Sequence, residues 1–307
     1  MSDWSFENWY PSRFGADDVI GAFNLITPQS ILAAIELVRT GVVYDLSFVI
    51  DQDIPIPGFH GSPFTNTQYT LENGVEWHDK RFGPATNGYS AQNLRLAISD
   101  HTGTHIDQFS HIGEMQADGD YLLYNGIRNK DIMTSLGASK LGIETMPPLI
   151  GRGILIDVAG HRGVDMLPMG YAIQPAELDE VLAAQGTEVR EGDLVLVHTG
   201  WGKNWLDPDT MMKGEPGLGK ACGQWAVDKN IVCWGCDQFA TDPLPYEFPG
   251  EALPMHISML VKAGIRLMEN VNMKPLLDAK VYEFLAIAAP LKIKGGTGSP
   301  IRLLAIT

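Results

Sequence analysis

Three histidines and one aspartate lie within eleven residues, in the run His101-Thr-Gly-Thr-His105-Ile-Asp107-Gln-Phe-Ser-His111. Imidazole nitrogens and carboxylate oxygens are the ligands that Zn²⁺ or Mn²⁺ prefers. Residues two apart on an extended strand point to the same face, so His105 and Asp107 can reach one ion. Gly103 allows a tight backbone path between the first two histidines, and a bend after Asp107 would return His111 to the same pocket. The segment therefore predicts a divalent metal site.

Two residues near the C-terminus are weaker candidates. Glu269 lies in the apolar run 265–271, where a carboxylate is costly unless it is paired or bound to a metal. The simplest structural alternative is a salt bridge to Arg266. His256 opens a predicted helix, where an ordinary hydrogen bond or a cap would also explain it. The residues alone leave these alternatives open.

A divalent ion held by His and Asp lowers the pKa of water toward about 7 and polarises a carbonyl group. We therefore expect a hydrolase that cleaves an amide or ester bond of a small molecule. A general base must take a proton and deliver it to the leaving group. His111 and Glu269 are the candidates for this role, and whichever of the two is not bound to metal fits it better.

Three other functions are compatible with the same residues. A metal-dependent cyclase or dehydratase acting on a polyketide-like compound would polarise a carbonyl without using water as nucleophile. A non-catalytic metal-binding or small-ligand-binding protein would hold a coordinatively closed ion. Thiol redox chemistry through Cys233 and Cys236 is the third, but residues three apart on a strand face opposite sides, so we expect buried structural thiols there.

Composition excludes several classes of protein. The chain has 307 residues, 45% of them hydrophobic and 19% charged, which is enough to bury a sizeable core. Its net charge of −15 repels phosphate backbones and anionic lipid, so we expect neither nucleic acid nor a membrane as partner. No apolar run reaches the roughly 18 residues of a transmembrane helix, and the N-terminus does not resemble a secretory signal. With three cysteines only, a cytoplasmic location is expected.

The pattern of elements predicts one α/β domain with strands in the majority. A helix is expected over 28–40, capped by Thr27 and buried through Ile31, Leu32, Ile35 and Val38. A strand is expected over 42–50, and 51–90 predicts long loops with a short strand near Tyr69. A strand over 93–99 leads into the histidine segment. Further strands are expected over 153–158, 194–198, 231–235, 266–268, 284–289 and 301–306, and helices over 175–184, 218–229 and 256–262, with a glycine-rich loop over 294–300.

Aromatic residues in the loops are candidates for the wall of a substrate pocket. Phe59, Trp77 and Trp201 are the ones we expect to contact substrate. The remaining histidines His60, His78 and His198 are expected outside the metal site.

The histidine segment matches the signature HxGTHxDxxxH and so resembles the cyclase-like metal-dependent hydrolases, a family that includes bacterial kynurenine formamidase, isatin hydrolase and a zinc-dependent trans-dienelactone hydrolase. Segments 14–28, 192–201 and 232–238 also resemble that family, so the likeness covers nearly the whole chain. It implies a swivelling β/β/α architecture with a mixed, strand-rich sheet. It also implies a homodimer or homotetramer. The order of the elements predicts a single domain over 1–307, and an aromatic N-terminus fits an arm of about residues 1–26 that packs on a neighbouring subunit, with Trp4, Phe6, Trp9 and Tyr10.

The resemblance also implies roles for single residues. His105 and Asp107 match metal ligands of the family, and His101 and His111 match motif histidines that bind metal in some members. His256 and Glu269 match a pair that completes a two-metal site in the formamidase branch, although their spacing here is one residue longer than expected. Gln238 matches a polar position beside a single metal. Whether one ion or two are bound stays open, and the implied substrate is a cyclic amide, a lactone or an N-formyl compound.

Overall fold

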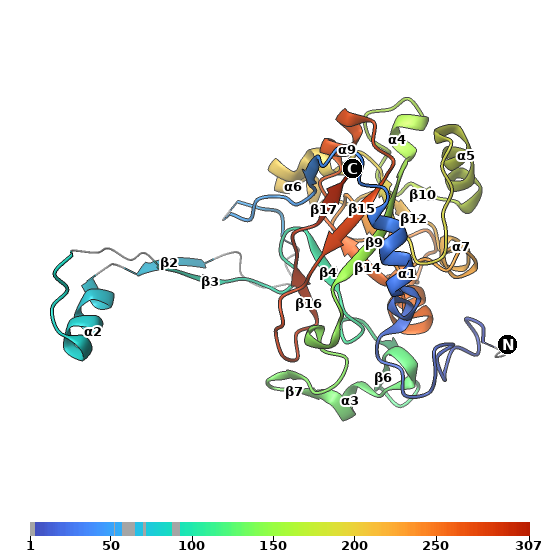
Figure 1. The fold of residues 1–307 in the computed structure, drawn as a ribbon. Helices are drawn as coiled ribbons and strands as arrows, with labels where there is room; N and C mark the ends of the chain where they lie inside the picture. The colour runs from blue at the N-terminus through green and yellow to red at the C-terminus, as the bar shows by residue number, and fades with distance from the viewer. Residues whose placement is uncertain (1–3, 52, 57–64, 70–71, 88–92) are drawn as a thin grey trace.

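The computed structural model describes residues 4–51, 53–56, 65–69, 72–87 and 93–307. Its centre is one curled mixed sheet of nine strands (Figure 1). Their spatial order is β1 (Val43–Asp45), β17 (Leu304–Ile306), β15 (Glu283–Ala288), β9 (Leu149–Asp157), β11 (Leu194–His198), β13 (Cys233–Cys236), β14 (Arg266–Glu269), β4 (His105–Asp107) and β16 (Gly298–Pro300). The expected α/β class with a mixed, strand-rich sheet is confirmed.

Four neighbouring strands of this sheet, β9, β11, β13 and β14, run parallel, and antiparallel strands flank them on both sides. Residues 154–156 and 194–197 are completely or almost completely buried, as expected of parallel strands covered on both faces. The carboxyl ends of the four strands meet along one edge. Asp157, His198, Gln238 and Glu269 lie at or just after these ends, so the topology gathers polar side chains from distant parts of the sequence.

The helices of the body are short. They are α1 (Pro28–Ile35), α3 (Asn129–Ile132), α4 (Val158–His161), α5 (Pro175–Gln185), α6 (Pro208–Met211), α7 (Cys222–Asp228), α8 (Pro254–His256) and α9 (Lys274–Ala279). A π-helix, η6 (Ile257–Ala263), continues α8. The 3₁₀ helices are η1 (Gly21–Leu25), η3 (Tyr124–Gly126), η4 (Ile143–Thr145) and η5 (Trp201–Leu206). Small ribbons pair β5 (Glu114–Met115) with β6 (Tyr121–Leu122), β7 (Met133–Thr134) with β8 (Gly137–Ala138), and β10 (Ala172–Ile173) with β12 (Gly217–Leu218).

The first helix corrects the sequence-based expectation. Thr27 caps it as predicted, in a reciprocal pair of hydrogen bonds with Ser30. The helix ends at Ile35 instead of residue 40, and its buried residue is Ala34, while Leu32 and Ile35 are 64% and 47% exposed. Because α1 packs on β9 and β15, a small residue at the contact lets it approach the sheet closely, and the predicted apolar face points outward.

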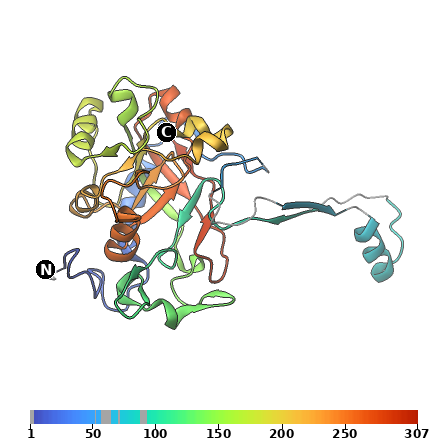
Figure 2. The same cartoon turned by 180° about the vertical axis from the view of Figure 1, so that it is seen from behind.

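The described residues 65–69, 72–87 and 93–97 form an arm that stands clear of the body in both views (Figures 1 and 2). It contains the antiparallel pair β2 (Thr65–Tyr69) and β3 (Asn93–Ala97), and α2 (Glu72–Phe82) between them. The strand near Tyr69 is confirmed, whereas α2 was not expected. The sequence of α2 is mostly polar and contains Gly74, so it lacks the apolar stripe from which a packed helix is predicted.

Most other elements lie where the sequence predicted them. The strand β11 has the predicted bounds, β9 begins at Leu149 rather than 153, and the predicted last strand is shortened to β17. The glycine-rich stretch 294–300 is not wholly a loop, because Gly298–Pro300 forms β16 beside β4. No helix in the described parts of the chain is long and apolar enough to cross a membrane.

The N-terminal segment is held to the body partly by a buried arginine. The Arg266 guanidinium is fully buried between the rings of Phe23 and Phe109, at 4.6 and 4.2 Å from their centroids. It donates to the carbonyl of Ile20 and to the side-chain oxygen of Gln108. Burial lowers the pKa of Arg266 to about 10. This residue therefore joins three segments: the N-terminal helix η1, the histidine segment and β14.

We expect Arg266→Ala to lower the free energy of unfolding by about 3 kcal/mol, because it removes two cation–π contacts and leaves a cavity. Urea denaturation measures the loss. Arg302→Ala is the control, since Arg302 pairs with Asp45 on the surface and such pairs contribute about 1 kcal/mol or less. Equal stability of the two variants would contradict this role.

Candidate metal centre

The strands β4 and β14 bring the candidate ligands together. They pair antiparallel, with Glu269 directly opposite His105. The His105 Nε2 atom lies 3.4 Å from Glu269 Oε2 and 3.5 Å from Asp107 Oδ1. The expectation that His105 and Asp107 share one face of a strand agrees with these distances. All three side chains are nearly or completely buried.

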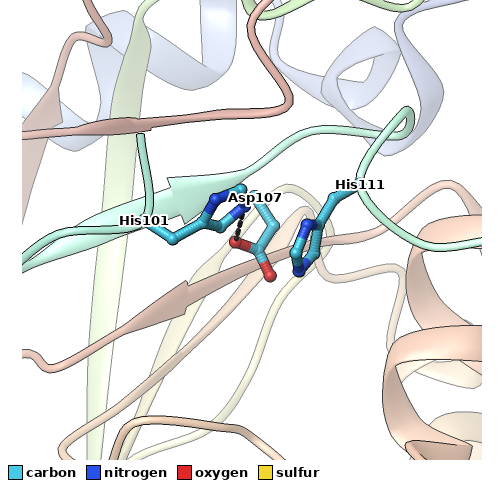
Figure 3. A group of neighbouring side chains, drawn as sticks. All are labelled: His101, Asp107 and His111. Atoms are coloured by element: carbon cyan, nitrogen blue, oxygen red, sulfur yellow. Dashed lines mark ion pairs between the residues drawn. The ribbon is translucent and has the colours of Figure 1, made fainter. Parts of the chain in front are cut away.

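The other histidines approach the same two carboxylates from outside these strands. His101 Nε2 lies 3.4 Å from Asp107 Oδ1. Figure 3 shows the Asp107 carboxylate beside the rings of His101 and His111, whose centroids are 3.9 Å apart. His256 Nε2 lies 3.6 Å from Asp107 Oδ2 and 3.4 Å from Glu269 Oε1. Two groups of side chains each bring three donor atoms within 4.8 Å of one another. One group is His101, Asp107 and His111, and the other is His105, Asp107 and Glu269.

The donor set fits a divalent metal ion. Both carboxylate oxygens of Asp107 are buried and accept no hydrogen bond, an arrangement that is costly unless a cation neutralises them. The five nitrogen–oxygen distances of 3.4 to 3.6 Å are close to the separation of about 3.4 Å between ligands around a tetrahedral ion with bonds of about 2.1 Å. The residues present therefore suit a metal, and their geometry agrees with either one or two ions.

Hydrogen bonds at the other ring nitrogen orient three of the histidines. The Nδ1 atoms of His105, His256 and His101 lie 2.8, 2.6 and 2.9 Å from the Gly103 carbonyl, an Asp242 carboxylate oxygen and an Asp100 carboxylate oxygen. Because these oxygens accept, Nδ1 carries the proton and Nε2 keeps its lone pair toward Asp107 and Glu269. Neither Asp100 nor Asp242 was predicted from sequence, since Asp242 is fourteen residues from His256 and no local pattern links the two.

Burial and close charges shift the pKa values of the cluster. Burial and the neighbouring Glu269 raise the pKa of Asp107. Burial opposes ionisation of Glu269 as well, but the adjacent imidazoles of His105 and His256 hold its pKa well below its usual range. Burial and repulsion by His101 and His256 lower the pKa of His111 well below its usual value. Its imidazole is therefore neutral near pH 7.

A cavity of about 530 Å³ opens beside the cluster. Its lining includes four cluster residues, His101, His111, His256 and Glu269, and its other walls are Ile112, Phe239, Ala240, Leu244, Tyr246 and Leu253. No lysine or arginine is among these lining residues. A neutral, partly apolar molecule therefore suits the cavity better than an anion, provided that the metal does not supply the charge.

The two aromatic residues expected from sequence that the structure describes, Trp77 and Trp201, do not line this cavity. Phe59 and His60 lie outside the described residues. Trp77 is on α2 of the arm, 59% exposed and away from the cluster. Trp201 is buried in η5, where its indole nitrogen is 3.4 Å from the Met211 carbonyl, and it does not line the cavity. The aromatic walls are instead Phe239 and Tyr246, which follow β13. Their position after the carboxyl end of a buried strand is the one signal that could have identified them.

Several remaining predictions can be compared with the coordinates. Gln238 is buried at the end of β13, and its side-chain amide makes no hydrogen bond, so its role beside a metal stays a prediction. His198 pairs with Asp157 at 2.6 Å and His78 with Asp79 at 3.2 Å, both away from the cluster. Arg266 does not pair with Glu269, whose partners are the histidines and Thr241. The structural alternative for Glu269 is therefore wrong.

The cysteines are buried, as expected. Cys222, Cys233 and Cys236 are all free thiols, and burial raises the pKa of each. A redox or nucleophilic thiol requires a lowered pKa and access to its partner. The environment of Cys233 and Cys236 thus opposes thiol redox chemistry.

Comparison with known proteins relates the whole chain to a family of enzymes and putative cyclases. The family model described as "Putative cyclase" matches residues 44–243. An isatin hydrolase from Roseibium aggregatum is 31% identical over 222 residues, which cover 69% of this chain and 73% of the relative. A kynurenine formamidase from Bacillus mycoides is 26% identical, over 86% of this chain and 97% of the relative. A solved structure described as a novel cyclase is 29% identical, with a TM-score of 0.84, and covers 98% of this chain and 99% of its own.

We expect Asp242→Asn to weaken metal binding by about 10- to 100-fold, because the carboxylate orients His256 through Nδ1. Competition with a chromophoric chelator measures the affinity. Asp157→Asn is a matched control, since Asp157 makes the same short hydrogen bond to His198 outside the cluster. Loss of metal affinity in both variants to the same extent would contradict a specific role for Asp242.

Proposed function

Because the chain belongs to the putative cyclase family, we propose that it is a metal-dependent hydrolase of the amidohydrolase or lactonase type. Its substrate would be a compact small molecule with a cyclic amide, a lactone or an N-formyl group. The names of the relatives, an isatin hydrolase and a kynurenine formamidase, support hydrolysis of carbon–nitrogen bonds next to an aromatic system.

The observation that carries this proposal is the environment of Asp107. A buried carboxylate without hydrogen bonds, within 3.6 Å of the Nε2 atoms of His101, His105 and His256, is favourable when a cation is bound between the donors. Zn²⁺ and Mn²⁺ are the ions that this donor set favours. Such an ion supplies Lewis acidity, which makes water nucleophilic and polarises a carbonyl group.

The residues around the cavity divide the remaining work. Glu269 Oε1 accepts from the Thr241 amide at 2.9 Å and faces His256, and its Oε2 faces His105. Its oxygens are thus committed to the cluster, which favours a role as ligand. His111 lines the cavity and is neutral near pH 7. We therefore assign His111 as the group that accepts the proton of the attacking water and returns it to the leaving nitrogen or oxygen.

The size and polarity of the cavity favour a substrate of modest size. Its volume of about 530 Å³ lies within the range of about 300 to 1,000 Å³ typical of small-molecule sites. Ile112, Phe239 and Leu244 provide apolar walls. A closed, purely structural metal site would not need an adjoining cavity of this size, so the arrangement supports a site that takes up a small molecule over a purely structural metal site.

Activity is expected on at least one member of a panel of lactones, cyclic amides and formamides, with isatin as the first probe. Exhaustive EDTA treatment should abolish it, and Zn²⁺ or Mn²⁺ should restore it. His105→Ala should lower both metal content and kcat/KM more than 100-fold, whereas His198→Ala, which removes a paired histidine outside the cluster, should lower neither as strongly. Turnover that survives metal removal in the folded protein would sink the proposal.

A cyclase or dehydratase is the second candidate, because the matching family model is itself described as a putative cyclase. The two reactions differ in the fate of water. Hydrolysis in ¹⁸O-water places one labelled oxygen in the product, whereas cyclisation or dehydration places none. Mass spectrometry of the product therefore separates them with the same enzyme preparation.

Self-association is a further part of the proposal. A two-stranded hairpin is marginally stable in water unless another element covers it, and the arm exposes Trp77 (59%) and Phe82 (66%). We propose that the arm packs on a second copy of the chain, which gives a homodimer or a homotetramer.

The double variant Trp77→Asp/Phe82→Asp is expected to shift the protein to a smaller oligomer or a monomer, because two apolar side chains are removed from the contact. Size-exclusion chromatography with light scattering measures the mass. Leu136→Asp is the control, since Leu136 is 89% exposed but lies on the body, outside the arm. A wild-type protein that is already monomeric at micromolar concentration would contradict the proposal.

A further inference from the structure

A buried glutamate far from the sequence motif holds one wall of the cavity. We propose that Glu215 is a positioning residue, which fixes the backbone of Phe239 and Ala240 so that this wall keeps its shape beside the candidate metal centre. The inference deepens the proposed function and rests on it only for the kinetic part of its test. Glu215 has no part in the histidine segment and was not among the residues expected from sequence.

The contacts of Glu215 form a clamp around a short loop. One carboxylate oxygen, Oε2, accepts from the amide of Phe239 at 2.9 Å, and the other, Oε1, accepts from the amide of Ala240 at 2.8 Å. Its own backbone exchanges two hydrogen bonds with Leu244, at 2.9 and 2.8 Å. Phe239, Ala240 and Leu244 all line the cavity. A single residue therefore fixes the backbone of the wall at three points.

The same loop is tied to the metal centre at its next two residues. Thr241 donates through its amide and its hydroxyl to Glu269 Oε1, at 2.9 and 3.2 Å. Asp242 accepts from the amide of Met255 at 2.7 Å and faces His256 Nδ1 at 2.6 Å. Residues 239–242 thus join the cavity wall to the cluster, and Glu215 is the anchor at the end away from the cluster.

The burial of Glu215 argues that this anchor is not an incidental loop contact. The side chain is completely buried, and no lysine, arginine or histidine in the described parts of the chain pairs with it. Burial and the nearby Glu269 raise the pKa of Glu215 well above its usual value. A carboxylate in such a position is costly, and the two amides that it accepts from are its compensation.

Among side chains of this length, the carboxylate of glutamate is the one with two oxygens that can each accept an amide N–H. In glutamine, one of the two oxygens becomes an NH₂ group, which would face the N–H of Phe239 or Ala240. Glu215→Gln therefore breaks one end of the clamp without changing the size of the side chain. Glu215→Asp keeps the charge but shortens the reach, so it tests the same clamp through distance.

The control is another buried carboxylate that accepts a backbone amide outside the cavity. Asp193 is 1% exposed and accepts from the Arg190 amide and from the Arg152 guanidinium, both at 2.7 Å. Asp193→Asn should cost stability as Glu215→Gln does, but it should leave the cavity unchanged. The comparison separates a general loss of packing from a specific change at the wall.

We expect amide hydrogen exchange in residues 239–244 to become at least about 10-fold faster in Glu215→Gln and Glu215→Asp, and to stay as in wild type in Asp193→Asn. Metal stoichiometry should be unchanged in all three variants. With the best substrate of the panel, KM should rise about 10-fold in the Glu215 variants while kcat falls by less than about 3-fold, because the wall binds substrate and the cluster performs the chemistry.

If a folded Glu215 variant exchanges the amide hydrogens of residues 239–244 at the wild-type rate, Glu215 does not fix the backbone of this loop. An equal fall of kcat in Glu215→Gln and Asp193→Asn with unchanged KM would overturn the positioning role. If the wild-type protein hydrolyses no member of the panel, the proposed function fails, but exchange and the affinity for isatin, measured by calorimetry, still decide for or against Glu215. Should Glu215→Gln not fold, Glu215→Asp provides the same readouts.

Discussion

The buried carboxylate of Asp107 is the constraint around which this molecule is organised. Neither oxygen accepts a hydrogen bond, and three imidazole Nε2 atoms face them at 3.4 to 3.6 Å. An uncompensated carboxylate in a protein interior costs several kcal/mol. A cation bound between the donor atoms would remove this cost. The strand pairing, the orienting hydrogen bonds and the adjoining cavity are all arranged with respect to this group.

The sheet brings distant residues to this point through register rather than through sequence proximity. Because β4 lies antiparallel beside β14, Glu269 is placed opposite His105. The carboxyl ends of the parallel strands β9, β11, β13 and β14 lie along one edge of the sheet. The loop after β13 at this edge forms a wall of the cavity and contains the carboxylate that orients His256. The strands β4 and β14 position His105, Asp107 and Glu269, while loops and α8 supply the other histidines and the cavity walls.

The family relationship and the buried cluster of His, Asp and Glu side chains are both compatible with a metal-dependent enzyme. The relatives named isatin hydrolase and kynurenine formamidase act, by their names, on different compounds, so the fold and the cluster do not by themselves specify a substrate. The cavity walls, unlike the cluster, are positioned to select between substrates. Phe239, Leu244 and Tyr246 come from a loop whose backbone donates to the Glu215 carboxylate, and none of the candidate metal ligands lies within residues 239–246.

The sequence by itself determined the features that depend on local geometry. The spacing of His105 and Asp107 places both on one face of an extended strand, and the capping of the first helix by Thr27 follows from adjacent residues. The apolar runs likewise predicted the central strands, because burial on both faces leaves a continuous pattern. In each case the residues that interact, or that share an environment, are within a few positions of one another.

Tertiary structure alone decided which distant groups meet. The helix α1 buries Ala34 instead of its larger apolar residues because the sheet beneath it determines which face is covered. The sequence of α2 has no apolar stripe from which a packed helix could be predicted. Asp242, Glu215, Phe239 and Tyr246 act through partners set by strand register and loop path. No local pattern encodes such contacts, since a hydrogen bond across the fold depends on the position of both elements at once.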